Sequence, residues 1–358
     1  MPTRMKDIAR DLGVSVVTVS KVLRGNSDIS KETRDRVLKR MQELNYRPNM
    51  MARGLAGGRT YTVGLVVPDL VQPYFAELAR SISSILRTAN RALILASSED
   101  DPEIERNEIR TLLSRGIDVL LIASCQQNLK NFYELGDQRT PYILVDRNFP
   151  HLDANFVGID DFRAGELATE HLIQCGKKRI AHISGKRIHT SKERLRGYKS
   201  VLVNHRIKVP DDYIILQDGL EEKGDSVGFQ SMQQLLSLRT PPNAVFCYND
   251  QAAIGAMHAA SEAGLKIPQD IAFVGCGNIG YSEYLRHPLT SIDQSIPELG
   301  RTAGELALSL DRDHTQPPVA IVLEPKLIAR DSTIQRSRAA LKNHRIKIAK
   351  PSAARGAR

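Results

Sequence analysis

The chain has 358 residues and a formal net charge of +9. This length exceeds the usual range of about 50–200 residues for one domain, so we expect two or three domains. No run of about 18 apolar residues occurs, and the N-terminus lacks the apolar centre of a signal peptide. These features argue against a membrane protein and a secreted protein, and we expect the chain to work in the cytoplasm.

The charge is distributed unevenly along the chain. Residues 1–60 carry 13 Lys and Arg against 6 Asp and Glu, and residues 332–358 carry 8 against none, whereas residues 61–331 carry 29 against 35. A basic N-terminal segment on an acidic chain suits a polyanion such as nucleic acid, although a solvated charged surface gives the same composition.

The sequence indicates no metal, no cofactor and no disulfide framework. Its four cysteines lie far apart, form no CxxC pair and have no His-rich segment near them. We expect buried free thiols at Cys125, Cys175, Cys247 and Cys276.

Residues 5–12 and 30–45 show helical patterns. The first pattern stops at Gly13, which permits left-handed backbone. The other opens with Ser30 and Thr33 as capping candidates. Its apolar stripe consists of Val37, Met41 and Leu44, with Leu38 widening the face.

Residues 16–24 are rich in β-branched side chains, which favour a strand. However, Ser15 is a suitable N-cap, and Val19, Val22 and Leu23 fall on one helical stripe, so we predict a helix. Three short helices with a glycine-bearing turn make a helix-turn-helix unit over residues 1–46, whose second helix enters the major groove of DNA.

Residues 47–60 have the pattern of a linker that contains one more short helix. Pro48 ends the preceding helix, because the residue before a proline avoids the α region. Asn49 can cap a helix that runs through Ala56, and Gly57 and Gly58 then interrupt the chain.

Residues 61–331 alternate strand and helix patterns, which predicts an α/β core of doubly wound parallel sheets. Its length suggests two such subdomains, with a ligand at the carboxyl ends of the strands. The clearest strand patterns cover residues 61–70, 91–98, 119–124, 141–147, 179–185, 243–250 and 271–278. Residues 332–358 are typical of a disordered basic tail.

Four segments carry a resemblance to a known family. They are MKDIARDLGVSVVTVSKVLRG, TRDRVLKRMQELNYRPNMMARGL, NDQAAIGAM and HPLTSIDQ, at residues 5–25, 33–55, 249–257 and 287–294. They resemble the signature segments of the lactose-repressor (LacI/GalR) family of bacterial transcription regulators. The likeness covers about residues 4–331 and implies a homodimer that binds double-stranded operator DNA.

The resemblance implies that the second helix reads the operator. Val16 and Val17 match the family's base-reading positions, with Lys21 one turn further on. Because adjacent residues on a helix diverge, both valines cannot face one core stripe, and a core role for both is the weaker alternative. Valine offers no hydrogen bond, so contact with thymine methyls is expected. Thr18 and Ser20 suit phosphate oxygens.

The linker resembles the family's hinge helix, which folds on the operator. Leu55 matches the leucine that wedges into the minor groove, and Ala52 and Arg53 match its neighbours. Arg47 and Asn49 suit phosphate oxygens. The sequence departs from the family at Gly54, which costs a short helix about 1 kcal/mol, and at Arg4, where a threonine cap is common.

The core resembles the periplasmic-binding-protein fold, in which two subdomains enclose a small effector. The likeness assigns about residues 61–158 and 291–319 to one subdomain and about residues 159–288 and 320–331 to the other. The effector changes the angle between them through its differential affinity for two arrangements.

The resemblance also places candidate effector residues in the cleft. Asp146, Arg194 and Asn249 match the family's cleft aspartate, arginine and asparagine, which suit sugar hydroxyls. Further candidates follow the first strand, where the alternative for the two aromatic residues is packing at a helix start. They are Asp69, Tyr74 and Phe75.

One departure bears on the class of effector. Gly277 stands where the family usually has an aspartate, and Asn278 follows it. Arg147 and Lys223 make the cleft less anionic. We therefore predict that the effector is a sugar derivative with a carboxylate or a phosphate, with a neutral sugar as the alternative.

These observations favour an effector-responsive transcriptional regulator, and the family resemblance implies a repressor. The alternative is a soluble sugar-binding receptor without a regulatory role, which the α/β part alone allows. An enzyme is not indicated, because no dinucleotide-binding, phosphate-loop or nucleophile motif occurs. A leucine heptad of the kind that makes tetramers is also missing from the tail, so we expect a dimer.

Overall fold

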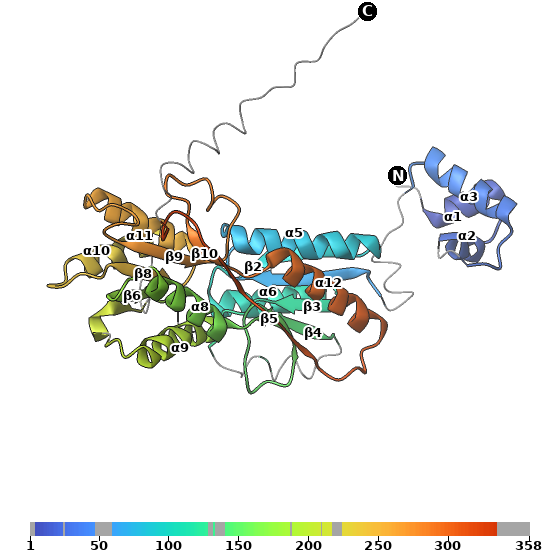
Figure 1. Ribbon diagram of the computed structural model, residues 1–358. Helices are drawn as coiled ribbons and strands as arrows, with labels where there is room; N and C mark the ends of the chain where they lie inside the picture. The colour runs from blue at the N-terminus through green and yellow to red at the C-terminus, as the bar shows by residue number, and fades with distance from the viewer. Residues whose placement is uncertain are drawn as a thin grey trace, which may run out of the picture. The chain divides into compact units, whose positions relative to one another are not determined.

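The computed structural model describes residues 4–23, 26–46, 59–127, 132, 140–186, 188–208, 210–216 and 224–334 (Figure 1). The chain divides into two compact units, residues 1–60 and residues 61–358. Each unit has its own hydrophobic core and is described by itself.

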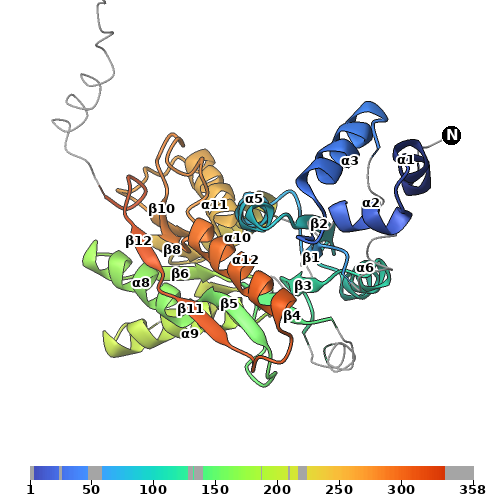
Figure 2. The ribbon, with the colours of Figure 1, turned by 90° about the vertical axis from the view of Figure 1, so that its right-hand side faces the viewer.

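The described part of the N-terminal unit contains helices α1, α2 and α3, which surround a small core (Figure 2). Their bounds are Met5–Leu12, Val16–Leu23 and Lys31–Glu43. Helix α1 ends at Gly13, whose φ of 65° is left-handed, as predicted. At its start, the backbone amide of Arg4, the N-cap residue, donates to the carboxylate of Asp7 at 2.9 Å. This bond is the half of a capping box that the acidic residue at the third helical position supplies, and it forms without the family's threonine.

Helix α2 forms in spite of its valines. The amide of Thr18 donates to the Ser15 Oγ at 3.0 Å, which confirms Ser15 as the N-cap. Val19 and Val22 are buried in the core of the unit, so the predicted stripe is confirmed. Burial of this stripe outweighs the strand preference of β-branched residues, which is less than about 1 kcal/mol per residue.

Helix α3 begins after Ser30, whose Oγ accepts from the Thr33 amide at 3.3 Å. Val37 and Met41 are buried as predicted. The prediction that Leu38 widens the core face is wrong, because its side chain is 43% exposed. Each residue of a helix is rotated by about 100° from the one before it, so Leu38 points well away from the direction of Val37. The core between three short helices is too narrow to cover both side chains.

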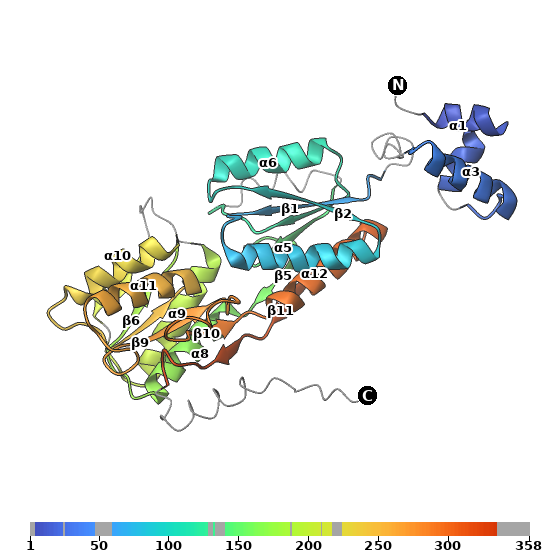
Figure 3. The same ribbon diagram turned by 90° about the horizontal axis from the view of Figure 1, so that it is seen from above.

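The first half of the core is a six-stranded parallel sheet in the order β11-β5-β4-β3-β1-β2. Helices α5 (Pro73–Thr88) and α12 (Ile296–Arg312) pack side by side on one face, and α6 (Pro102–Ser114) covers the other (Figure 3). The strands, in chain order, are β1 Thr62–Val67, β2 Ala92–Ser97, β3 Val119–Ile122, β4 Tyr142–Val145, β5 Asn155–Ile159 and β11 Ala320–Leu323. Alternate residues of β1 face opposite helices, as the period of a strand requires.

The second half is a six-stranded sheet in the order β12-β10-β9-β8-β6-β7, parallel except for the β10–β12 pair. Helices α8 (Asp161–Gln174) and α9 (His189–Asn204) cover one face, and α10 (Asp225–Leu236) and α11 (Asp250–Glu262) cover the other. The strands are β6 Ile180–Ile183, β7 Ile214–Ile215, β8 Ala244–Cys247, β9 Ala272–Cys276, β10 Thr290–Asp293 and β12 Lys326–Ile328, and a short 3₁₀ helix covers Asp211–Tyr213. The predicted class, an α/β core of two doubly wound subdomains, is confirmed.

The structure places the crossings between the subdomains close to the approximate bounds of the prediction. Strand β10, at residues 290–293, belongs to the second sheet, and β11, at residues 320–323, belongs to the first. The chain therefore returns to the first half after residue 293 and to the second after residue 323, whereas the prediction placed these crossings at about residues 291 and 320. Short apolar strands pair through backbone groups, so their side chains do not reveal which sheet they join.

Glycine pairs hold the helices of the second half very close together. A Cβ on Gly197 of α9 would lie 2.1 Å from the Phe162 carbonyl oxygen, and one on Gly165 of α8 would lie 2.1 Å from the Arg194 carbonyl oxygen. The α10–α11 pair repeats this contact through Gly228 and Gly255. Hydrogen in place of a side chain lets the two backbones touch.

The core of the second half encloses an uncharged histidine. The His182 ring stacks on Phe246 at 4.8 Å between centroids, and its Nδ1 lies 2.9 Å from the Phe246 carbonyl oxygen. Nε2 is buried and has no hydrogen-bond partner among the described residues, and burial lowers the pKa of His182 to about 3. The neutral ring donates from Nδ1, so protonation of Nε2 would place an uncompensated charge in the core.

Replacement of His182 by phenylalanine is therefore expected to reduce the loss of unfolding free energy that occurs as the pH falls below neutral. The unfolded chain binds a proton at His182 below pH 6.5 and the folded chain does not above about pH 3, so the wild type loses stability as pH falls through this window. From pH 7 to pH 5 the wild type should lose about 2 kcal/mol more than His182→Phe. Urea unfolding at both pH values measures the difference, and equal losses would contradict it.

The cysteines agree with the sequence prediction in their chemistry. All four are free thiols, and Cys175 is half-buried while the others are buried. Within the described residues, no group of His, Cys, Asp and Glu is arranged to hold a metal ion. In the same residues no helix is both long enough and apolar enough to cross a membrane.

Candidate functional site

Helix α2 carries two large apolar side chains that do not belong to the core. The exposed fractions of Val16 and Val17 are 43% and 61%, whereas Val19 is fully buried. The alternative that both valines serve the core is therefore excluded. An exposed pair of valines at the start of a helix offers shape and methyl groups to a partner but no hydrogen bond.

The polar residues of α2 already have local partners. The Thr18 hydroxyl lies 2.8 Å from the Ser15 Oγ, and the Lys21 ammonium pairs with the Asp28 carboxylate. Ser20 is half-buried and also takes part in a polar contact. Lys21 must leave Asp28 before it can reach a base edge. Arg47, Asn49, Ala52, Arg53 and Leu55 lie outside the described residues, so their roles stay predictions.

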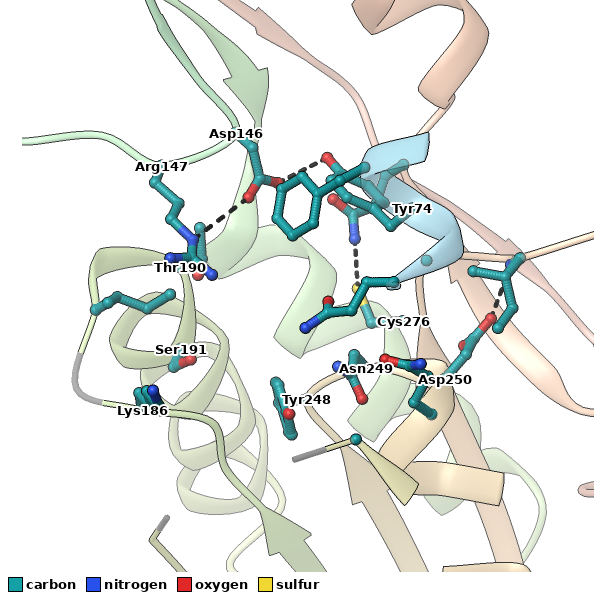
Figure 4. Close-up of a pocket in the computed structure, with 18 of the residues that line it drawn as sticks. Tyr74, Asp146, Arg147, Lys186, Thr190, Ser191, Tyr248, Asn249, Asp250 and Cys276 are labelled. Atoms are coloured by element: carbon teal, nitrogen blue, oxygen red, sulfur yellow. Dashed lines mark hydrogen bonds and ion pairs between the residues drawn. The ribbon is translucent and has the colours of Figure 1, made fainter. Parts of the chain in front are cut away.

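The core unit contains a cavity of about 100 Å³ between its two halves, which we call the inner cavity (Figure 4). Its walls come from the carboxyl ends of β4, β8 and β9 and from the starts of α5, α9 and α11. Of the predicted effector residues, the inner cavity brings together Tyr74, Phe75, Asp146, Arg147, Arg194 and Asn249.

Tyr74 and Asp146 form one polar contact in the wall. The Tyr74 hydroxyl donates to Asp146 Oδ1 at 2.7 Å, and both side chains are buried. Burial, with the charge of Asp146, raises the pKa of Tyr74 well above its usual value, so the hydroxyl stays protonated. Asp146 adopts a φ of 66°, a conformation that non-glycine residues adopt mainly at turns and functional sites. Tyr74 and Phe75 also pack in the core, so helix-start packing and cavity lining are both true of them.

Arg194 is the buried cation of the inner cavity, with an exposed fraction of 5%. Its Nε donates to Asp161 Oδ1 at 2.8 Å, and its Nη1 donates to the Tyr248 carbonyl oxygen at 2.6 Å. Burial raises the pKa of Asp161 to about 6 and Arg194 opposes that shift, so the pair is ionised at pH 7. Asp161, from the first turn of α8, also lies 2.7 Å from Arg194 Nη2 and thereby orients a guanidinium that lines the cavity.

Asn249 and Asp250 sit where β8 leads into α11. The Asn249 side chain caps α11 by accepting from the Ala252 amide at 2.8 Å, which leaves its amino group for the cavity. Asp250 accepts from the Ser282 hydroxyl at 2.9 Å and from the Ser291 hydroxyl at 2.5 Å. Burial raises the pKa of Asp250, and these hydrogen bonds oppose the rise.

One salt bridge joins the two halves across the cavity among the described residues. The Lys186 ammonium lies 3.6 Å from Asp100 Oδ2, and Arg147 Nη1 lies 3.3 Å from Asp100 Oδ1. Asp100 and Arg147 belong to the first half and Lys186 to the second. Any change in the angle between the halves therefore changes this contact.

Two predicted effector residues do not line the inner cavity. The Asp69 carboxylate instead accepts from the Val71 amide at 2.8 Å, because a short side chain at a turn bonds its own backbone more easily than a distant ligand. The Asn278 Oδ1 accepts from Arg330 at 2.6 Å, so this oxygen already has a partner. Their roles in effector binding stay predictions. Lys223 lies outside the described residues.

Gly277 lines the inner cavity in a conformation that favours glycine, with a φ of 132°. A Cβ there would have space, with its nearest neighbour 3.7 Å away on Ile279. The backbone rather than crowding therefore disfavours an aspartate at this position.

Sequence reasoning missed several polar residues of the inner cavity. Thr190 and Ser191 are each 4% exposed, and Gln294 has a buried Oε1 that no described residue bonds. Cys276 accepts from the Gln294 amide nitrogen at 3.5 Å, and burial raises the pKa of this thiol to about 12. A signal was available for the first two, since they precede Arg194 by one helical turn.

Comparison with known proteins identifies the class of protein to which these features belong. The model of the lacI family of bacterial regulatory proteins matches residues 4–49, and that of the periplasmic binding protein-like domain matches residues 169–333. The catabolite control protein A of Staphylococcus epidermidis is 32% identical over 93% of this chain and 100% of its own length. The transcriptional repressor PurR of Haemophilus influenzae is 32% identical over 92% of this chain and 98% of its own length.

Solved structures agree. A lac repressor dimer bound to operator and an anti-inducer superimposes with a TM-score of 0.83 at 26% identity, covering 94% of this chain and all of that chain. The regulator CelR in complex with cellobiose gives a TM-score of 0.69 at 27% identity, covering 92% and 99%. The chain belongs to the lacI family, and it is a DNA-binding transcriptional regulator.

Proposed function

We propose that the protein is a repressor that binds a near-palindromic operator as a homodimer. Its affinity for the operator falls or rises when a small effector occupies the inner cavity. The exposure of Val16 and Val17 beside the buried Val19 carries the proposal, because it gives α2 a face with no structural role in its own unit. A receptor without a regulatory role has no use for this face. Since the target is chromosomal DNA, we place the protein in the cytoplasm. No residue is assigned a catalytic role.

The proposed effector is a sugar or a sugar derivative. The inner cavity offers the donors and acceptors that hydroxyl groups need, from Asp146, Arg194 and Asn249. Among the described residues that line it, carboxylates and cations are equal in number, with Asp100, Asp146 and Asp250 beside Arg147, Lys186 and Arg194. The inner cavity by itself therefore suits a neutral ring, and the relative CelR was solved with cellobiose.

Selection from a pool of random DNA duplexes with the full chain tests operator binding. We expect a near-palindromic consensus whose affinity falls roughly a thousandfold between about 50 and 200 mM salt, through release of counterions from contacted phosphates. Recovery of no consensus, or an affinity that salt leaves unchanged, would overturn the proposal.

The two exposed valines give a sharper prediction. Replacement of thymine by uracil at the operator positions that face Val16 and Val17 should weaken binding about fourfold per contacted methyl group, which is about 0.8 kcal/mol each. Gel-shift titration measures the change. The same replacement elsewhere in the operator is the control, and equal effects at all positions would show that the valines do not read thymine.

A further inference from the structure

A second cavity, of about 310 Å³, adjoins the inner cavity, and we call it the outer cavity. It lies between the loop after β4 and the first turn of α9. Arg147 and Ile188 line both cavities, so the two compartments share a wall. A ligand that passes this wall can touch both.

The two compartments differ in charge. The described residues that line the inner cavity include as many carboxylates as cations, whereas those that line the outer cavity include no Asp and no Glu. Arg147 and Lys192 supply positive charge there, and His151 and His189 supply imidazoles. Burial lowers the pKa of His189, so this ring is a neutral hydrogen-bonding group at pH 7.

The start of α9 adds to the positive potential of the outer cavity. Helix α9 has 16 residues, and Ile188, the residue at its N-cap, makes no side-chain capping bond. The N-cap side chain therefore does not cap the first-turn amides, and the positive end of the helix dipole lies at the outer cavity. Beside them, the nearly buried hydroxyls of Thr190 and Ser191 line the inner cavity. Lys192 is exposed and forms no salt bridge within the described part of the chain.

We infer that the outer cavity binds the anionic group, a phosphate or a carboxylate, of an effector whose hydroxylated part occupies the inner cavity. The inference rests on the proposed function and names the ligand class of the same site. Arg147 is held by Asp100 at 3.3 Å and remains in place at the shared wall, while Lys192 is free to move onto the anion. Charge-assisted hydrogen bonds from a guanidinium, an ammonium and helix amides are the usual partners of such oxyanions.

Calorimetric titration of the full chain with matched probes tests the inference. The probes are glucose, glucose 6-phosphate, glucuronate and inorganic phosphate, and the variants are Lys192→Glu and, as a control, Lys199→Glu, an exposed lysine further along α9 that lines neither cavity. We expect at least one of the three anionic probes to bind, and Lys192→Glu to weaken it by about tenfold or more, whereas Lys199→Glu should change it by less than about twofold.

Each result decides the question. Tight binding by glucose alone, or anion binding that both variants weaken equally, would overturn the inference. Binding of glucuronate but not of the phosphates would identify the anion as a carboxylate, and the reverse as a phosphate. Operator selection with the same proteins keeps the two proposals separate, because a protein that binds its operator but no anion retains the proposed function and loses only the inference.

Discussion

Replacement of Arg194 by methionine is expected to lower the free energy of unfolding by about 3–5 kcal/mol and to abolish effector binding. In the wild type, Asp161 Oδ1 lies 2.8 Å from Arg194 Nε, and the Asp161 residue is only 4% exposed. The substitution therefore leaves a buried carboxylate without its charged partner. The Tyr248 carbonyl oxygen also loses its donor. Urea unfolding followed by circular dichroism measures the first effect, and calorimetric titration with the probe that binds the wild type measures the second.

A double variant separates the two effects. Asp161→Leu together with Arg194→Met replaces both members of the buried pair by apolar groups, which is often neutral for stability. We expect this variant to regain most of the lost stability while effector binding stays absent, because the guanidinium that lines the cavity is gone. A double variant that binds the probe normally would show that Arg194 only holds the structure together.

The N-terminal unit shows how far a sequence pattern reaches. The spacing of Val19 and Val22 predicts the buried face of α2, and geometry alone then leaves Val16 and Val17 outside, as the structure has them. The same reasoning overestimates the core at Leu38 of α3. A helical period gives the direction of a side chain, whereas the width of the core depends on how closely the neighbouring helices approach.

The inner cavity shows what a sequence pattern leaves open. The family resemblance predicts Asp146 and Asn249, and both follow a buried strand, β4 and β8, at the edge where parallel strands end. Asp69 also follows a strand, yet its carboxylate bonds the Val71 amide within its own turn. Gln294 reaches the cavity from the segment that crosses between the two halves after β10, and Lys186 reaches it from the second half. The sequence does not show how these segments are arranged around the cavity.

Close packing of α8 against α9 positions Arg194 and Asp161, so Gly197→Ala should have a large effect. A methyl group at Gly197 would lie 2.1 Å from the Phe162 carbonyl oxygen and 2.9 Å from the Glu166 amide nitrogen, and neither backbone atom can move alone. We expect a loss of about 3 kcal/mol in the free energy of unfolding, despite the helix-favouring effect of alanine of about 1 kcal/mol.

The control is Gly280→Ala, where an added Cβ has no neighbour within 4 Å. The free energy of unfolding of this variant should lie within about 0.5 kcal/mol of the wild-type value. Since Gly165 of α8 contacts the Arg194 carbonyl oxygen, separation of the two helices also displaces the guanidinium from Asp161. Gly197→Ala should therefore lower the affinity for the effector probe by at least about tenfold, whereas Gly280→Ala should leave this affinity unchanged. If Gly197→Ala loses stability but binds the probe as tightly as the wild type, then the helix contact supports the fold without positioning Arg194.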